Sequence, residues 1–132
     1  DMGYNNTYYI YDLPEIKIIQ QYYLNKLNVS HKIIIDYNEL KNIEISNKKK
    51  LFIATWALSE VDFDLRDKIL DIIKDFDAVI IVFQNEIWSR NNSQYFGDGG
   101  IFKKKLHKIK SWHILNIPYI KWDGGNYYLL GV

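Results

Sequence analysis

The sequence predicts an α/β fold with a mostly parallel sheet and helices on both of its faces. Short apolar runs of strand length alternate along the chain with segments whose apolar residues recur at helical spacing. Strands that alternate with helices pair in parallel, because right-handed crossovers are the common way to connect them. The last two runs, residues 112–120 and 126–132, are joined by a turn with the sequence WDGG, which predicts an antiparallel hairpin.

The first half of the chain contains two expected strands and one helix. Residues 7–13 are the first strand. Pro14 and Glu15 then begin a helix, since proline suits the first helical position and glutamate the positive end of the helix dipole. One face of this amphipathic helix collects the apolar residues Ile16, Ile19, Tyr23, Leu24 and Leu27. The β-branched residues 31–38 predict a buried second strand, and the lysine-rich residues 41–50 predict a solvated connection.

The second half alternates in the same way. Residues 51–58 predict a third strand, and Asp62 or Asp64 can cap the helix that follows. The buried stripe of that helix consists of Leu65, Ile69, Ile72, Ile73 and Phe76. Residues 78–85, the most hydrophobic stretch, predict a fourth strand that is buried on both faces. An irregular segment with the glycine-rich sequence FGDGG and a basic helix over 102–110 are expected next.

The composition limits the classes of function. With 132 residues, of which 48% are hydrophobic, we expect a single domain over residues 1–132. A formal charge of +1 gives no overall field that would attract nucleic acid or an anionic membrane. The sequence contains no run of about eighteen apolar residues and no signal peptide, so we expect no membrane span and a cytoplasmic protein. The absence of cysteine excludes a disulfide scaffold, a thiolate metal site and a cysteine nucleophile.

Two acids mark the expected binding edge. Ligands of an open parallel sheet bind outside the carboxyl ends of its strands, and Asp12 and Asp36 both stand at such ends. A carboxylate offers two acceptors to the hydroxyl pair of a ribose, and an acid one strand further out can reach the amine of an adenine. An aspartate ahead of Pro14 at a strand end is equally good turn and cap chemistry, so a structural role for Asp12 stays open.

Four segments carry a family resemblance. YIYDLPEI, residues 9–16, resembles the second-strand motif of class I S-adenosylmethionine-dependent O-methyltransferases. LFIATWALSE, VIIVFQNE and NYYLLG, which begin at Leu51, Val79 and Asn126, resemble more narrowly the sugar O-methyltransferases of bacterial polysaccharide gene clusters. This resemblance implies a Rossmann-like methyltransferase sheet that closes with an antiparallel hairpin. It also implies S-adenosylmethionine as cofactor and a hydroxyl of a sugar or polysaccharide precursor as methyl acceptor.

The resemblance assigns residues to the adenosine part of the cofactor. Asp12 would bind the ribose hydroxyls, and Leu13 would pack beside the adenosine. Asp36 and Tyr37 would lie by the adenine.

Further residues follow the two central strands. Thr55 and Trp56 would contact the methionine end of the cofactor or the acceptor, whereas Ser59 and Asn85 would face the sugar. The candidates for the catalytic base are Glu60 and Glu86. Either glutamate could instead hold a divalent ion with the side-chain carbonyl of Asn85, and the presence and identity of a metal stay open. A solvated loop or cap role is the alternative for each glutamate.

The chain departs from the family in one respect. The first strand of the family and its Gly-x-Gly loop are expected before Asp1, and no segment of the sequence replaces them. In the family sheet that strand lies between the first and third strands predicted here. We therefore expect a C-terminal portion of a methyltransferase, which need not bind cofactor alone. The alternative is a non-catalytic methyltransferase-like module, or a subunit completed by another chain, and a homo-oligomer stays open.

Overall fold

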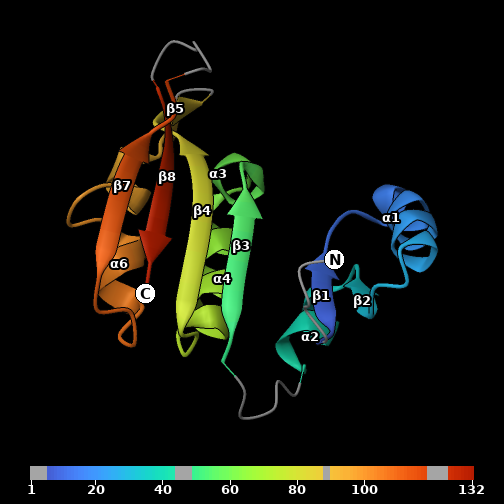
Figure 1. Cartoon of the computed structure of the whole chain (residues 1–132). Coiled ribbons are helices and arrows are strands. Elements are labelled where there is room, and N and C mark those ends of the chain that lie inside the picture. Colours follow the sequence, from blue (N-terminus) through green and yellow to red (C-terminus); the bar gives the residue numbers. More distant parts are fainter. Residues whose placement is uncertain (1–5, 44–48, 88–89, 119–124) are drawn as a thin grey trace. The chain divides into compact units, whose positions relative to one another are not determined.

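A computed structural model of the chain describes residues 6–43, 49–87, 90–118 and 125–132 (Figure 1). The chain divides into two compact units, Asp1–Ser46 and Asn47–Val132. The fold is α/β, with a two-stranded parallel sheet in the first unit and a mixed four-stranded sheet in the second. Since the units are separate clusters of contacts, each is described by itself, and a single domain over residues 1–132 stays a prediction.

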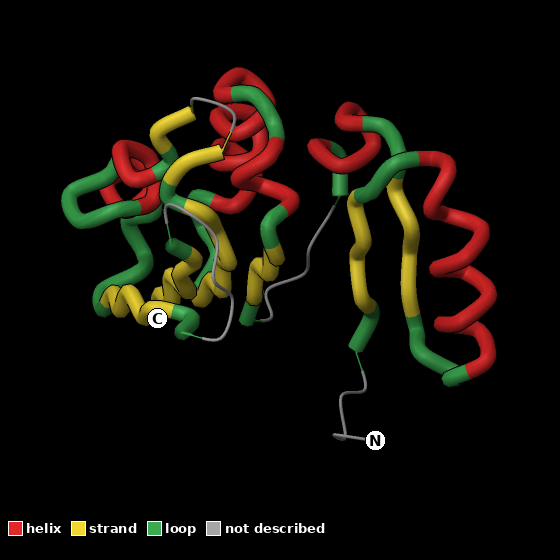
Figure 2. Tube along the Cα trace, turned by 90° about the horizontal axis from the view of Figure 1, so that it is seen from above, coloured by secondary structure: helices red, strands yellow, loops and turns green. Residues whose placement is uncertain are grey.

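The first unit is one parallel strand pair with two helices. Its elements are β1 (Tyr8–Tyr11), α1 (Pro14–Lys26), β2 (His31–Ile34) and α2 (Tyr37–Lys41). Tyr8 lies opposite His31 and Tyr11 opposite Ile34. The helix α1 runs along one side of the pair (Figure 2). Its start at Pro14 agrees with the sequence prediction.

The expected apolar face of α1 is exposed. Ile19 is 56% exposed, Tyr23 61% and Leu27 70%, whereas Leu24 is half-buried. Ile16 of this face is exposed as well, and the exposed apolar residues Ile18 and Tyr22 lie on another side of the helix, so no single stripe can bury all of them.

The second predicted strand is shorter than expected and mostly not buried. It ends at Ile34, which is the buried residue of the strand. The reason is a competing helix: Asp36 caps α2 by accepting the backbone N–H groups of Asn38 and Glu39. The residues predicted as the end of a strand therefore form the start of a helix.

The second unit contains the larger sheet. Its elements are β3 (Leu51–Thr55), α3 (Ala57–Glu60), α4 (Phe63–Ile73), β4 (Ala78–Gln84), β5 (Glu86–Ile87), β6 (Arg90–Asn91), α5 (Ser93–Phe96), α6 (Ile101–Lys105), β7 (Trp112–Asn116) and β8 (Asn126–Gly131). The strand order is β3-β4-β8-β7, and β5 pairs with β6 in a separate two-stranded sheet.

The large sheet is mixed, whereas the sequence predicted a mostly parallel one. The β3 and β4 strands are parallel, but β8 is antiparallel to both β4 and β7. The predicted hairpin of β7 and β8 is present, although the WDGG turn lies largely at residues 122–124, outside the described residues. The difference arises because β8, rather than β7, occupies the place beside β4.

The core of the second unit lies between the sheet and its helices. Helices α3 to α6 occupy one side of the four-stranded sheet (Figure 2), not both sides as predicted. Ile81, Phe83 and Leu129 from the sheet are buried in one cluster with Leu70 of α4 and Phe102 of α6. Burial of these side chains supplies most of the hydrophobic stabilisation of the unit.

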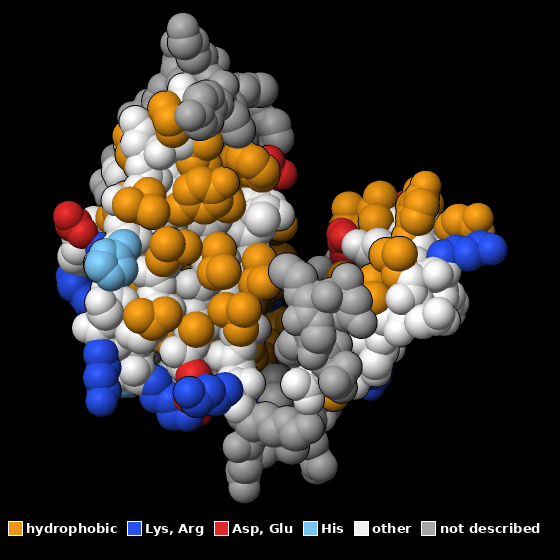
Figure 3. Space-filling view, viewed as in Figure 1, with side chains coloured by type: hydrophobic (Ala, Val, Ile, Leu, Met, Phe, Trp, Pro, Cys, Tyr) orange, Lys and Arg blue, Asp and Glu red, His pale blue; other side chains and the backbone are white. Residues whose placement is uncertain are grey.

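The opposite face of the sheet carries exposed apolar side chains. Hydrophobic residues spread across the face turned toward the viewer in Figure 3. They include Leu51 and Ile53 of β3, Leu115 of β7 and Tyr128 of β8, which are between 39% and 55% exposed. The prediction that β4 is buried on both faces therefore holds only in part, because Ile80 on this face is half-exposed.

Local signals in the second unit agree with the structure to different degrees. Asp62 caps α4, because its carboxylate accepts the N–H of Leu65 at 2.8 Å. Ile69 and Ile73 of the predicted stripe are buried. The glycine-rich FGDGG ends α5 and begins α6, which covers only the first part of the predicted basic helix. No helix in the described part of the chain has the length and apolar character needed to cross a membrane.

Candidate functional site

Asp12 and Asp36 lie at the same edge of the two-stranded sheet. They follow the carboxyl ends of the parallel strands β1 and β2, and the N–H of Asp12 donates to the carbonyl of Ile34 at 3.2 Å. The register places position 12 opposite Ile35, so the two acids are offset by one residue. This is the edge at which parallel sheets bind ligands.

The carboxylate of Asp12 is held by two hydrogen bonds. Oδ1 accepts the N–H of Leu13 at 2.8 Å, and Oδ2 accepts Nε2 of Gln20 at 2.6 Å. Each carboxylate oxygen can accept a second hydrogen bond, so two acceptor positions are left in a fixed orientation. The Oε1 atom of Gln20 is buried and has no hydrogen-bond partner among the described residues.

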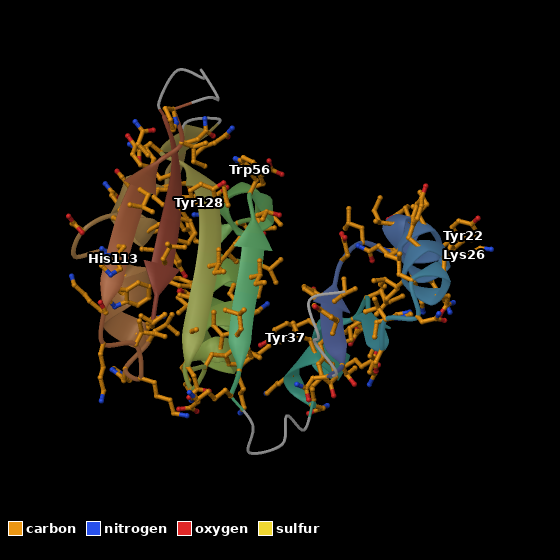
Figure 4. All side chains as sticks on the ribbon, viewed as in Figure 1. Tyr22, Lys26, Tyr37, Trp56, His113 and Tyr128 are labelled. Carbon is orange, nitrogen blue, oxygen red and sulfur yellow. The ribbon has the colours of Figure 1, made fainter. Side chains whose placement is uncertain are left out.

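Asp36 has a structural role that the sequence analysis did not assign to it. Its Oδ1 accepts the N–H groups of Asn38 at 2.8 Å and Glu39 at 3.2 Å, and it thereby caps α2. Both hydrogen bonds use Oδ1. Within the described residues, Oδ2 of Asp36 therefore remains available to accept a hydrogen bond. Tyr37 is the first residue of α2 and half-buried (Figure 4), while Leu13 is 64% exposed.

A second group of predicted residues follows β3. Thr55 ends the strand, and Trp56 comes next with φ +59° and ψ −36°, a conformation that bulky residues rarely adopt. The N–H of Trp56 donates to Val82 at 2.9 Å, and its carbonyl accepts the N–H and the hydroxyl of Ser59 at 2.8 and 2.6 Å. Its indole Nε1 donates to Oδ1 of the buried Asn126 at 3.3 Å. Figure 4 shows Trp56 where β3 ends.

Arg66 joins the segments after β3 and β4. This fully buried residue donates from Nη2 to the carbonyl of Ser59 at 2.6 Å and from Nη1 to Oδ1 of Asn92 at 2.7 Å. Asn92 in turn donates from Nδ2 to the carbonyl of Gln84 at 2.8 Å and from its N–H to the carbonyl of Asn85 at 2.7 Å. The two connections at the carboxyl ends of β3 and β4 are thus fixed to each other.

The predicted acceptor and base residues differ in access. Ser59 is fully buried and bonded to the carbonyl of Trp56, so its side chain holds the turn and does not reach solvent. Asn85 is half-buried, and Glu60 is exposed at the end of α3. Glu86 begins β5, but its side chain lies outside what the structure describes.

Sequence reasoning missed four residues of these networks. They are Gln20, Arg66, Asn92 and Asn126. Arg66 alone had a local signal, since it lies three residues before Ile69 and seven before Ile73, inside the apolar stripe of α4. The described residues contain no group of three or more His, Cys, Asp or Glu side chains that could hold a metal ion.

A cluster of Asp67, Tyr95 and Lys105 links three helices of the second unit, α4, α5 and α6. The buried hydroxyl of Tyr95 donates to Oδ1 of Asp67 at 2.8 Å, and Nζ of Lys105 reaches the same oxygen at 3.1 Å. These two hydrogen bonds lower the pKa of the Asp67 carboxyl, the bond from Tyr95 having the larger effect. Burial, followed by the neighbouring Asp67, raises the pKa of the Tyr95 hydroxyl, which stays protonated.

Comparison of the sequence with protein-family models and with curated proteins finds no match in either.

Proposed function

We propose that the chain takes part in methyl transfer from S-adenosylmethionine to a hydroxyl of a sugar. The observation that carries the proposal is the placement of Asp12 and Asp36 at the carboxyl ends of two adjacent parallel strands. The sequence resemblance in the segments that contain Asp12, Trp56 and Asn85 supplies the reaction class.

The geometry of Asp12 supports the ribose assignment. A vicinal diol presents two O–H donors, and the Asp12 carboxylate retains one acceptor position on each oxygen beyond its bonds to Leu13 and Gln20. Those two bonds fix the plane of the carboxylate before any ligand arrives, which lowers the entropy lost on binding. In the same proposal, Oδ2 of Asp36 accepts from the adenine amine, and Leu13 and Tyr37 pack against the base.

The proposed methyl transfer requires a general base, and Glu60 is the first candidate. Bound S-adenosylmethionine supplies the methyl group, which moves by in-line displacement, so the acceptor hydroxyl must be aligned and must lose its proton. Glu60 is an exposed carboxylate on the segment that Ser59 and Arg66 hold in place. We assign Glu60 as the base, with Glu86 as the other candidate. Thr55 and Trp56 then contact the methionine end or the acceptor, and Asn85 binds the sugar.

The finer fold assignment is a Rossmann-like methyltransferase sheet. The resemblance implies one further strand beside β1 and beside β3. In the described residues, β1 and β3 each have an open edge. The backbone N–H of Trp56 donates to the carbonyl of Val82, and the carbonyl of Lys50 accepts the N–H of Ala78. These two residues flank β3, and backbone groups alternate in direction along a strand, so the even-numbered residues of β3 bond to β4. The N–H and C=O groups of Leu51, Ile53 and Thr55 therefore point to the open edge, which supports the assignment.

Isothermal titration calorimetry with S-adenosylmethionine tests the proposal. Asp12→Asn preserves the shape of the side chain, and the amide of Gln20 can turn so that Oε1 accepts from the new Nδ2. The variant replaces one carboxylate acceptor by a donor and removes the charge, so the affinity should fall about tenfold to a hundredfold. Asp64→Asn, a change of an exposed aspartate in the first turn of α4, is the matched control and should leave the affinity unchanged.

Two results would contradict the proposal. An unaltered chain that binds no S-adenosylmethionine rejects a cofactor site built by residues 1–132 alone, and an Asp12→Asn variant with unchanged affinity rejects the ribose assignment.

A second candidate function is a non-catalytic subunit whose sheet is completed by another chain. The exposed Leu51 and Ile53 on β3, together with the open edge of that strand, favour it. Sedimentation velocity that shows concentration-dependent association, combined with no cofactor binding, would support this candidate over the enzyme.

A further inference from the structure

Trp56 has a strained backbone that the core does not require. Among the described residues, the other non-glycine residue with positive φ is Asn28, a residue type that tolerates this region. Trp112 is packed against the hydrophobic core, with its ring centroid 6.3 Å from that of Phe102. Trp56 does not belong to that cluster. Strain of this kind persists where the surroundings enforce it, and such residues concentrate at functional sites.

The surroundings of Trp56 fix its indole in one orientation. The ring N–H is directed at Oδ1 of Asn126, which is fully buried. The backbone carbonyl is held by Ser59, whose own carbonyl accepts from the buried Arg66. Because the N–H is occupied by the protein, the half-buried indole can offer a ligand only its apolar faces.

We propose that Trp56 is the stacking platform for the pyranose ring of the acceptor. A pyranose combines an apolar C–H face with a rim of hydroxyl groups, so it needs an aromatic surface surrounded by hydrogen-bonding side chains. The exposed Thr55 and Glu60 and the half-buried Asn85 follow the carboxyl ends of β3 and β4 together with Trp56. The choice of a sugar as ligand rests on the proposed function.

Nuclear magnetic resonance of the ¹⁵N-labelled indole groups of the chain tests this inference. The Trp56 signal is assigned by its loss in Trp56→Phe, and the methyl pyranosides of glucose, galactose, mannose and rhamnose are the probes. At least one glycoside should shift the Trp56 signal saturably and leave the Trp112 signal in place. Trp56→Leu should weaken the affinity roughly tenfold, whereas Trp56→Phe, which keeps an aromatic face, should weaken it by roughly threefold or less.

Each outcome decides the inference. It is overturned if no glycoside shifts the Trp56 signal, if adenosine shifts it instead, or if Trp56→Leu binds as the unaltered chain does. An unchanged Trp112 signal in Trp56→Leu shows that the variant is folded. Titration with S-adenosylmethionine is independent: glycoside binding without cofactor binding retains the platform and rejects a cofactor site built by this chain alone. Cofactor binding without glycoside binding rejects the platform alone.

Discussion

Trp56 occupies a backbone conformation that glycine adopts without strain. A side chain at φ +59° and ψ −36° costs about 1–3 kcal/mol, because the Cβ atom crowds the neighbouring peptide groups. The hydrogen bond that the indole donates to Asn126 and the one that the Trp56 carbonyl accepts from the Ser59 hydroxyl hold the residue there. The sequence carries no sign of this, since ATWALSE contains no turn residue of the kind that marks positive φ.

A pair of substitutions measures the strain at Trp56. Both Trp56→Gly and Trp56→Ala remove the indole and its bond to Asn126, so they differ mainly in the presence of Cβ. The glycine variant should be more stable than the alanine variant by about 1 kcal/mol, as measured by urea denaturation. The adjacent Ala57 lies in α3, so Ala57→Gly should instead lose about 0.5–1 kcal/mol. Equal stability of the two Trp56 variants would exclude strain at this position.

Arg66 is a buried cation whose planar fork serves three acceptors. It bonds to the carbonyls of Ser59 and Val61 and to Asn92, and the guanidinium carbon lies 4.9 Å from the ring centroid of Phe63. Asn92 lies 26 residues away in the sequence, so no local pattern could have paired the two. Asp62, in contrast, was predictable as a cap because its partner Leu65 is three residues away.

The fork of Arg66 predicts that lysine cannot replace it. Arg66→Lys keeps the charge but replaces the planar fork by one amine, so the acceptors at Ser59, Val61 and Asn92 can no longer all be bonded in their present geometry. The free energy of unfolding should fall by about 2–4 kcal/mol in urea denaturation. Lys68→Arg, an exposed change on the same helix, should stay within about 0.5 kcal/mol of the unaltered chain. A small effect of Arg66→Lys would mean that the network can be rebuilt by one amine.

Elements with strong local signals were predicted well. Pro14 at the start of α1, the apolar run of β4 and the β7–β8 hairpin agree with the structure. The helix α2 was missed because an aspartate such as Asp36 is compatible both with the end of a strand and with a helix N-cap. In the structure its carboxylate accepts two backbone N–H groups of α2, so it is an N-cap. The place of β8 beside β4 depends on pairing across about 45 residues, and the sequence pattern of a strand does not specify its neighbour.

The Asp67 cluster predicts how α4, α5 and α6 respond to acid. Because the pKa of Asp67 is lowered below its ordinary value of 3.8 in the folded protein, the ionised carboxyl stabilises the fold. That contribution is fully present above the unfolded pKa and is lost as the pH falls through the folded pKa. Asp67→Asn should therefore lower the free energy of unfolding at neutral pH, and the difference should shrink as the pH falls below about 4.

Urea denaturation at a series of pH values measures this dependence. Asp75→Asn, which replaces another exposed carboxylate of the same unit, is the control and should not change the slope at low pH. Tyr95→Phe removes the donor that contributes most to the shift, so it should flatten the same part of the profile. An Asp67→Asn profile parallel to that of the unaltered chain would contradict the assignment.

The two units of the whole molecule differ in how much they bury. The second unit encloses a cluster of buried side chains from three strands, β3, β4 and β8, and from four helices, α3 to α6. In the described residues of the first unit, Ile34 is the only buried hydrophobic side chain, and α1 exposes most of its apolar residues. The composition predicted enough apolar surface for one hydrophobic core over the whole chain. Composition does not indicate in which unit the apolar side chains are buried.

This difference predicts unequal protection of the backbone in hydrogen exchange followed by mass spectrometry. Amides open with a free energy set by the cooperative unit to which they belong, and a unit with little buried surface opens easily. Peptides that cover β1 and β2 should therefore exchange roughly a hundredfold faster than peptides that cover β4 and β8. Within the second unit, Ile53 at the open edge should exchange faster than Ala54, whose N–H is directed to β4. Protection of β1 and β2 equal to that of β4 and β8 would mean that the side chains of α1 are covered in solution.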